Sequence, residues 1–422
     1  MVTAANPAAT EAHMGSLTRL FNIFAVVTLL VGAAWAASST QVIYSFAGDE
    51  DGEYTDTDLV LDSAGNIYGT TVVGGDFGSG SVFQLSPAGG SWTHTVLYSF
   101  TGLSDGGQPY KGVTLDAQGN IYGTAVIGGK FGACPEDGCG VAYKLVNSGG
   151  TWTQTVIHAF NGNDGYGPGA GLTFDTAGNL YGMTPTGGAN AAGVIYQLQP
   201  QQDGTWKLKV IHAFTGGNDG ASGSAGRLLL DAAGNLYGVA TAGGANGKGT
   251  AFRLTPAQNG KWNFTTLYAF KGQPDAGFPY GGLTADTAGN LYGTTYYDGA
   301  NNLGSVYQLS KGVGGKWKER VLYSFKGGKD GNSSISNLVI DKNGRLYGTT
   351  SEGGAGCSCG TIFRVAKDAN GVWKESVAYR FGGVPDAGFA YNGMVADSAG
   401  NMFGATVHGG DDNEGAIYKF VP

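Results

Sequence analysis

The chain has 422 residues, of which 78 are glycine and only 13 % are charged. Its formal net charge of −8 provides no basic surface for nucleic acid, so nucleic acid is excluded as a partner. A hydrophobic content of 41 % and regularly spaced aromatic residues argue against disorder and favour a packed all-β protein.

The N-terminal segment has the features of a secretory signal. Arg19 precedes an apolar run over residues 20–34, and Ala-Trp-Ala at residues 34–36 matches a small-residue cleavage site. Asn22, Thr28 and Gly32 interrupt the run, which disfavours a membrane anchor. We therefore predict a signal peptide over residues 1–36. The mature chain, residues 37–422, contains no second apolar span and is expected to be secreted, at the cell surface or periplasmic.

One turn recurs throughout the rest of the chain, most plainly as Asp-Thr-Ala-Gly-Asn-Leu-Tyr-Gly at residues 175–182. Aspartate can accept hydrogen bonds from N–H groups within the turn, and glycine can adopt the positive φ of a tight hairpin. The seven copies are spaced 54 to 59 residues apart, a period typical of a repeat architecture. They begin at Asp62, Asp116, Asp175, Asp231, Asp286, Asp341 and Asp397.

Each repeat contains four short apolar runs separated by turn residues, which predicts a seven-bladed β-propeller of four-stranded antiparallel blades. The last strand of six repeats begins near a tryptophan, but the seventh repeat lacks such a strand. Residues 40–46 resemble that missing strand, so we expect the N-terminal strand to pair with the last blade and close the ring. The expected units are residues 37–57 (closing strand), 58–100, 101–160, 161–214, 215–270, 271–325, 326–381 and 382–422.

Chain direction places the long inter-blade loops and the Gly-Gly loops on one face, and the aspartate turns on the other. Loops on a rigid scaffold commonly carry function, so the inter-blade loop face is the predicted ligand-binding surface. Every inter-blade loop contains an aspartate, which either joins a carboxylate ring around the axis or stabilises its own loop by local hydrogen bonds. These residues are Asp51, Asp105, Asp164, Asp219, Asp275, Asp330 and Asp386.

The first repeat departs from the others by its acidic residues. Asp49, Asp51, Asp56 and Asp58 could supply oxygen ligands to calcium, although they lack the ordered spacing of an EF-hand loop. The alternative is a solvated acidic loop. No cofactor is firmly implied, and calcium is the one candidate.

Aromatic residues occur in the same loops and could stack on sugar rings or pack over the blade ends. Two singletons of this face, Arg227 and His408, could contact an anionic ligand, although each alone is a weak signal. The aromatic candidates are Tyr110, Tyr166, Phe278, Tyr280, Tyr296, Tyr297, Phe389 and Tyr391.

The histidines give no metal-ligand spacing. His158 and His212 occupy the place in their own strands that Tyr98 occupies in the first repeat. They are predicted to pack there as substitutes for the tyrosine. The four cysteines form two local pairs, Cys134 with Cys139 and Cys357 with Cys359, which export would favour as disulfides. The second pair could alternatively be labile or bind a metal, because a C-x-C bridge is tight.

The repeat resembles the Gloeo/Verruco ("GloVer") tandem repeat family of exported bacterial propeller-like proteins. The matching text is Leu-Tyr-Ser-Phe-Thr-Gly at 97–102, Asp-Gly at 105–106, Pro-Tyr at 109–110 and the turn at 116–124, and the resemblance extends over residues 41–420. It implies an exported protein, often with a C-terminal anchor, which is not evident before Pro422. It implies no catalytic residues.

Uniform repeats and scattered aromatics favour an exported, non-catalytic recognition module that binds glycan or protein through the inter-blade loop face, as a monomer. Two alternatives remain open. One is a structural or adhesive surface protein. The other is an extracellular polysaccharide lyase or glycosidase, for which no matched acid and base pair is evident.

Overall fold

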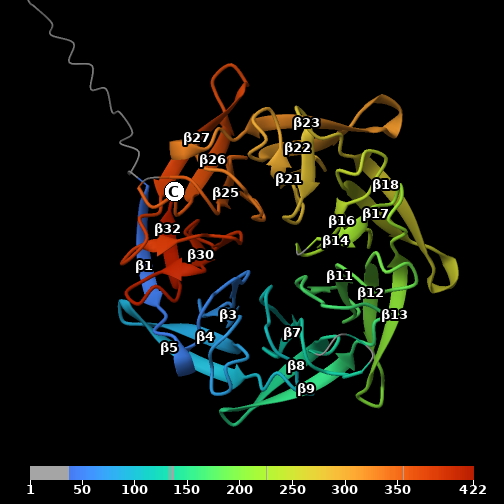
Figure 1. Ribbon diagram of the computed structural model, residues 1–422, viewed down its shortest axis with the longest axis vertical. Coiled ribbons are helices and arrows are strands. Elements are labelled where there is room, and N and C mark those ends of the chain that lie inside the picture. Colours follow the sequence, from blue (N-terminus) through green and yellow to red (C-terminus); the bar gives the residue numbers. More distant parts are fainter. Residues whose placement is uncertain (1–37, 133, 135–136, 225, 355) are drawn as a thin grey trace, which may run out of the picture. The chain divides into compact units, whose positions relative to one another are not determined.

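Seven antiparallel sheets follow one another around a ring, as the sequence predicted (Figure 1). The computed structural model describes residues 38–132, 134, 137–224, 226–354 and 356–422; the predicted signal peptide lies outside them. Within this described part, no helix is long and apolar enough to cross a membrane. The only helical elements there are short 3-10 turns: η1 (Asp49–Asp51), η2 (Gln258–Gly260), η3 (Val313–Gly315) and η4 (Gly328–Asp330).

The strands of blades one to three run from the inside of the ring outward in chain order. Blade one comprises β2 (Val60–Leu61), β3 (Ile67–Thr71), β4 (Ser81–Ala88) and β5 (Ser91–Ser99). Blade two comprises β6 (Val113–Leu115), β7 (Ile121–Ala125), β8 (Val141–Ser148) and β9 (Thr151–Ala159). Blade three comprises β10 (Thr173–Phe174), β11 (Leu180–Thr184), β12 (Val194–Pro200) and β13 (Trp206–Ala213).

Blades four and five each carry one additional short strand in the inter-blade loop, and blade six does not. Blade four comprises β14 (Ala221–Gly223), β15 (Leu229–Leu230), β16 (Leu236–Ala242), β17 (Thr250–Pro256) and β18 (Trp262–Ala269). Blade five comprises β19 (Ala276–Pro279), β20 (Thr284–Ala285), β21 (Leu291–Asp298), β22 (Ser305–Lys311) and β23 (Trp317–Ser324). Blade six comprises β24 (Val339–Ile340), β25 (Leu346–Thr350), β26 (Thr361–Lys367) and β27 (Trp373–Arg380).

Blade seven is built from both ends of the described chain. It contains β29 (Val395–Ala396), β30 (Met402–Thr406), β32 (Ala416–Val421) and, as its outer strand, β1 (Ser39–Ser45). β1 pairs antiparallel with β32 from Ser39 opposite Val421 to Ser45 opposite Ala416, so the predicted ring closure is confirmed. The loop strands β28 (Ala387–Gly388) and β31 (His408–Gly409) pair beside this sheet.

The hydrophobic core lies between neighbouring blades. Each outer strand is followed by a fully buried phenylalanine whose backbone N–H donates to a glycine carbonyl of the same blade, as Phe100 does to Gly80 at 2.9 Å. Gly182 in β11 faces Tyr196 of β12, and a Cβ at this glycine would lie 2.4 Å from the tyrosine hydroxyl. Glycine therefore lets the large ring pack across the strand pair. The buried phenylalanines are Phe46, Phe100, Phe160, Phe214, Phe270, Phe325 and Phe381.

The aspartate turn closes the two inner strands of every blade. In blade three, Asp175 accepts hydrogen bonds from the N–H groups of Ala177 and Asn179, from the Asn179 amide and from the Tyr181 hydroxyl, all at 2.8–2.9 Å. Arg345 replaces the asparagine in blade six, and its Nε lies 2.5 Å from Asp341 Oδ2. The turns thus fix the inner strands and leave the opposite face to the longer loops.

Candidate functional site

The seven inter-blade aspartates stabilise their own loops. Asp105 accepts hydrogen bonds from the Thr101 N–H and from the Tyr98 hydroxyl at the end of outer strand β5, both at 2.9 Å. The Nε2 atoms of His158 and His212 lie 3.0 Å from the aspartates of the following loops, so these histidines substitute for that tyrosine. Tyrosines contact the other four in the same way: Asp51, Asp275, Asp330 and Asp386.

The structure distributes the four acidic residues of the first repeat among separate contacts. Asp49 is exposed, whereas Asp51 bonds the Tyr44 hydroxyl at 2.5 Å and lies 3.0 Å from His94 Nδ1. Burial alone would raise the pKa of Asp51, but the hydrogen bonds from His94 and Tyr44 lower it overall. Among the described residues, no group of three or more His, Cys, Asp or Glu side chains is placed to hold a metal ion.

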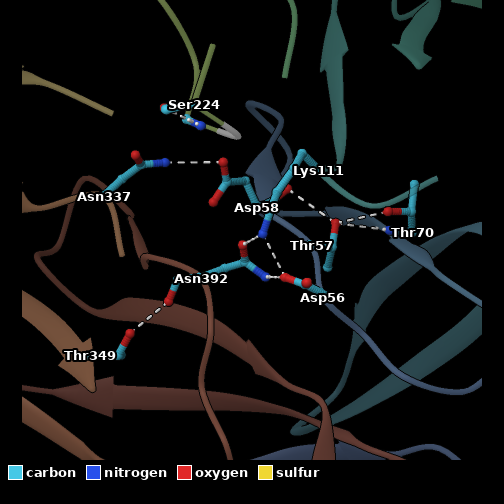
Figure 2. A network of polar contacts seen from close by, with 10 residues as sticks. Asp56, Thr57, Asp58, Thr70, Lys111, Ser224, Asn337, Thr349 and Asn392 are labelled. Atoms are coloured by element: carbon cyan, nitrogen blue, oxygen red, sulfur yellow. Dashed lines mark hydrogen bonds and ion pairs between the residues drawn. The ribbon is translucent and has the colours of Figure 1, made fainter. Parts of the chain in front are cut away.

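Asp56 instead belongs to a polar cluster that joins three blades (Figure 2). Its Oδ1 accepts hydrogen bonds from Lys111 Nζ at 2.7 Å and from Asn392 Nδ2 at 2.6 Å. Lys111 Nζ also donates to Asn392 Oδ1 at 2.7 Å. Lys111 and Asn392 are only 8 % and 4 % exposed, so this triad is held rigidly beneath the surface.

A second polar layer lies beside the first. Asp58 Oδ2 accepts a hydrogen bond from Asn337 Nδ2 at 3.0 Å, and Arg227 donates from Nη2 to the Val113 carbonyl at 3.0 Å. Burial raises the pKa of Asp58, although Lys111 and Arg227 oppose the shift. Burial likewise lowers the pKa of Arg227, and Asp58 opposes it. The two groups therefore offset each other's charge in a confined space.

These six residues, which we call the axial cluster, come from blades one, two, four, six and seven. Blades that are not neighbours in a ring can meet only near its axis, so the cluster lies at the centre of the molecule. Other blades have glycine at the position equivalent to Asp58, Arg227 and Asn337, which allows the approach. A Cβ at Gly282 would lie 2.7 Å from Asn337 Oδ1. The members are Asp56, Asp58, Lys111, Arg227, Asn337 and Asn392.

Three of these residues, Lys111, Asn337 and Asn392, were missed by the sequence analysis. Lys111 and Asn392 stand five residues before the turn aspartate, where other repeats have small residues such as Ala170 and Gly281. Asn337 stands four residues before it, where other repeats have glycines such as Gly282. Only alignment of these two positions across all seven blades would have revealed the signal.

Cavities lie on both sides of the axial cluster. A cavity of about 470 Å³ is lined by Asp58, Arg227, Asn337 and the apolar inner strands, on the side of the aspartate turns. A small space of about 20 Å³ lies within the cluster, between Asp58, Lys111 and Tyr280. These dimensions show that the axial cluster narrows the centre of the ring.

A third cavity, the tyrosine pocket, opens on the inter-blade loop face. Its volume is about 320 Å³, within the range of small-molecule sites. Asp56 is its only charged lining residue, and Oδ2 of this carboxylate has no hydrogen-bond partner in the described part of the chain. The complete lining is Tyr54, Asp56, Val72, Val73, Gln108, Tyr110, Tyr391 and Val407.

Blade five carries a second aromatic group, the blade-five row. Its ring centroids follow one another from Phe278 to Tyr297 (6.0 Å), from Tyr297 to Tyr296 (4.4 Å) and from Tyr296 to Tyr280 (5.6 Å). Tyr297 is 47 % and Tyr280 39 % exposed. Because Tyr280 also lines the small space within the axial cluster, the row extends from the loop face toward the axis.

The remaining predicted contacts have packing roles. Tyr166 packs against the core between blades two and three, and Phe389 against the core between blades six and seven. His408 meets the rings of Phe389 and Tyr54 edge-on, at centroid distances of 5.4 and 5.3 Å. His408 therefore supports one wall of the tyrosine pocket.

Both predicted cysteine pairs form disulfides, one between Cys134 and Cys139 and one between Cys357 and Cys359. The first lies in the β7–β8 loop and the second in the β25–β26 loop, equivalent places in blades two and six. Each bridge fixes a loop on the same face as the tyrosine pocket.

Comparison with solved structures recovers the propeller architecture. PorZ, a surface component of the type-IX secretion system of Porphyromonas gingivalis, aligns with a TM-score of 0.50 at 13 % identity, over 90 % of this chain and 48 % of that one. A putative 6-phosphogluconolactonase from Bacteroides uniformis aligns with a TM-score of 0.49 at 13 % identity, over 76 % and 84 %. A Dyadobacter fermentans protein of unknown function aligns with a TM-score of 0.47 at 11 % identity, over 92 % and 99 %.

Sequence comparison gives one family. Among curated protein sequences, none matches this chain. The Gloeobacter/Verrucomicrobia repeat matches residues 132–327, from the β7–β8 loop of blade two through blade five. The same turn and strand pattern continues in the other blades. The family resemblance predicted from the repeat sequence is therefore supported over residues 132–327 of the chain.

Proposed function

We propose that this protein is an exported, non-catalytic recognition module that binds glycan through its inter-blade loop face. The observation that carries the proposal is the tyrosine pocket, in which Tyr54, Tyr110 and Tyr391 surround the free carboxylate oxygen of Asp56. Tyrosine rings supply flat apolar area for a sugar ring, and the carboxylate can accept hydrogen bonds from sugar hydroxyls. The blade-five row would offer further stacking positions to a longer chain.

The acid content of the pocket favours binding over hydrolysis. Glycosidases generally use two carboxyl groups that flank the scissile bond, whereas Asp56 is the one acid in the pocket lining. Asp58, the nearest acid in sequence, bonds Asn337 and lines the cavity on the other side of the axial cluster. Lys111 Nζ also lies 2.7 Å from Asp56 Oδ1 and forms an ion pair with it.

Two observations support export. Both disulfides would persist in an oxidising compartment and are uncommon in reducing ones. The predicted signal peptide over residues 1–36 ends just before strand β1, so its removal would leave the closing strand intact.

A glycan array followed by calorimetry tests the proposal, with calcium and with a chelator in parallel arms. We expect saturable binding without released oligosaccharide, and about a tenfold loss of affinity for Tyr391→Ala, the scale of one aromatic stacking contact. The matched control is Phe131→Ala, which removes an exposed ring on another loop of the same face. Released oligosaccharide, or binding only to a protein, would overturn the proposal.

A further inference from the structure

The floor of the tyrosine pocket has an unused acceptor. Lys111 and Asn392 both bond Oδ1 of Asp56, which leaves Oδ2 directed to no donor among the described residues. The Asp56 side chain is 20 % exposed, whereas that of Lys111 is 9 % exposed. The carboxylate is therefore the part of this ion pair that a ligand in the pocket can reach.

The Asp56 carboxylate acts on two of the surrounding tyrosine rings. Burial raises the pKa of Tyr391, and the negative charges of Asp56 and Glu352 raise it further. Burial also raises the pKa of Tyr110, as does Asp56, while Lys111 opposes them. The Asp56 carboxylate therefore lies close enough to act on both rings, and a negative charge at this place repels an anionic group and attracts a cation.

Two more acids adjoin the third wall of the pocket. The N–H of Tyr54 donates to the Glu414 carbonyl at 3.1 Å, and the Glu53 and Glu414 side chains interact closely. Burial and the neighbouring Glu414 and Asp49 raise the pKa of Glu53. Lys111 balances Asp56, but no basic residue lines the pocket itself.

Aromatic faces and an accessible carboxylate are the groups that proteins use to hold an organic ammonium ion. We propose that the tyrosine pocket binds the protonated amino group of an amino sugar, so that the ligand is a glycan containing free, non-acetylated amines. This inference rests on the proposed glycan-binding function. The ammonium donates to Asp56 Oδ2 and lies against Tyr54, Tyr110 and Tyr391, while neighbouring sugars extend toward the blade-five row.

Calorimetry with three hexasaccharide probes tests this assignment: glucosamine, N-acetylglucosamine and glucose units, each β-1,4-linked. We expect the glucosamine hexamer to bind about tenfold or more tightly than the other two, the scale of a charge-assisted contact plus a cation–π contact. High salt should reduce this preference, because charge attraction is screened.

Asp56→Asn should abolish the preference for the glucosamine hexamer over the N-acetylglucosamine and glucose hexamers. The matched control is Asp76→Asn, which removes an exposed carboxylate on the β3–β4 loop of the same face without touching the pocket. If Asp56→Asn does not fold, Tyr54→Ala provides the second variant, since Tyr54 is already 37 % exposed. This variant should weaken the glucosamine hexamer about three- to tenfold through loss of a cation–π contact.

The outcomes separate the two proposals. Equal affinity for all three hexamers would overturn the ammonium assignment and leave glycan recognition standing. If none of the hexamers binds and the glycan array shows no binding, both the ammonium assignment and the glycan-binding proposal are overturned. Tighter binding of a hexalysine peptide than of the glucosamine hexamer would also overturn the assignment to an amino sugar.

Discussion

Lys111 Nζ lies 2.7 Å from Asp56 Oδ1, and this ion pair joins the second blade to the first at the centre of the ring. Both side chains are largely buried, at 9 % and 20 % exposure. Asn392 of blade seven bonds both partners, so the pair also links the last blade to the first two.

Removing the lysine should destabilise the propeller. Lys111→Met would leave Asp56 without its cation and should lower the free energy of unfolding by about 2–4 kcal/mol, the cost of an uncompensated, largely buried charge. Urea unfolding at pH 7 measures the change. The matched control is Lys271→Met, whose side chain is 67 % exposed and lies 4.0 Å from Asp275; it should cost under about 1 kcal/mol. Equal losses for the two variants would contradict a stabilising role for the central pair.

The closing strand should contribute strongly to stability. Phe46 follows β1, is fully buried and packs edge-on against Phe83 of blade one at a centroid distance of 5.3 Å. Phe46→Ala should lower the free energy of unfolding by about 3–5 kcal/mol through cavity formation. Gln41→Ala changes an exposed residue of the same strand and serves as the control. A loss below about 1 kcal/mol for Phe46→Ala would indicate that the junction between blades seven and one is not part of the cooperative core.

Two pairs of neighbouring carboxyl groups, Glu319 with Asp275 and Glu375 with Asp330, should make the fold less stable at high pH. Burial and the nearby Asp275 together raise the pKa of Glu319 to about 9. Burial and Asp330 likewise raise the pKa of Glu375 to about 8. Because these folded-state values exceed the ordinary value of 4.5, each protonated glutamate stabilises the fold fully only below about pH 4.5. The contribution decreases as the pH rises and is lost above the folded-state pKa.

Glu319→Gln should therefore flatten the dependence of stability on pH. Urea unfolding from pH 5 to pH 9 should show a smaller decrease for this variant than for the unmodified protein, and greater stability of the variant at the alkaline end. Glu50→Gln, which changes an exposed side chain of η1, provides the control. A parallel decrease for Glu319→Gln and the unmodified protein would show that this pair does not cause the effect.

The aspartate turn should be stabilised mainly by its aspartate. Asp175→Ala removes an acceptor shared by two backbone N–H groups and two side chains, and should cost about 1–3 kcal/mol of unfolding free energy. Thermal and urea unfolding measure the loss. Asp203→Ala, in the exposed β12–β13 hairpin, should have a clearly smaller effect because both of its bonds go to Thr205 at the surface. The reverse order would contradict the structural role assigned to the recurring turn.

The architecture of the ring could be predicted from the amino-acid sequence. Turn residues act locally, so Asp175 and the six equivalent aspartates indicated seven repeats. The last repeat lacks an outer strand, which indicated that residues near Thr40 close the ring. The cysteine pairs were also predictable, because each pair is separated by few residues. Such features depend on neighbours in the chain or on a period that is visible along it.

The residues that meet at the centre of the ring could be identified only from the folded chain. Lys111 and Asn392 are 281 residues apart, yet their side chains form a 2.7 Å hydrogen bond. The inter-blade aspartates recur more regularly and could have formed an axial ring, but they bond their own loops near the outer strands. A residue that recurs in every repeat indicates a local structure that all blades share. A site at the axis instead requires different side chains from different blades. Their convergence depends on loops of distant blades meeting at the axis of the closed ring, and no local pattern in the sequence shows which side chains meet there.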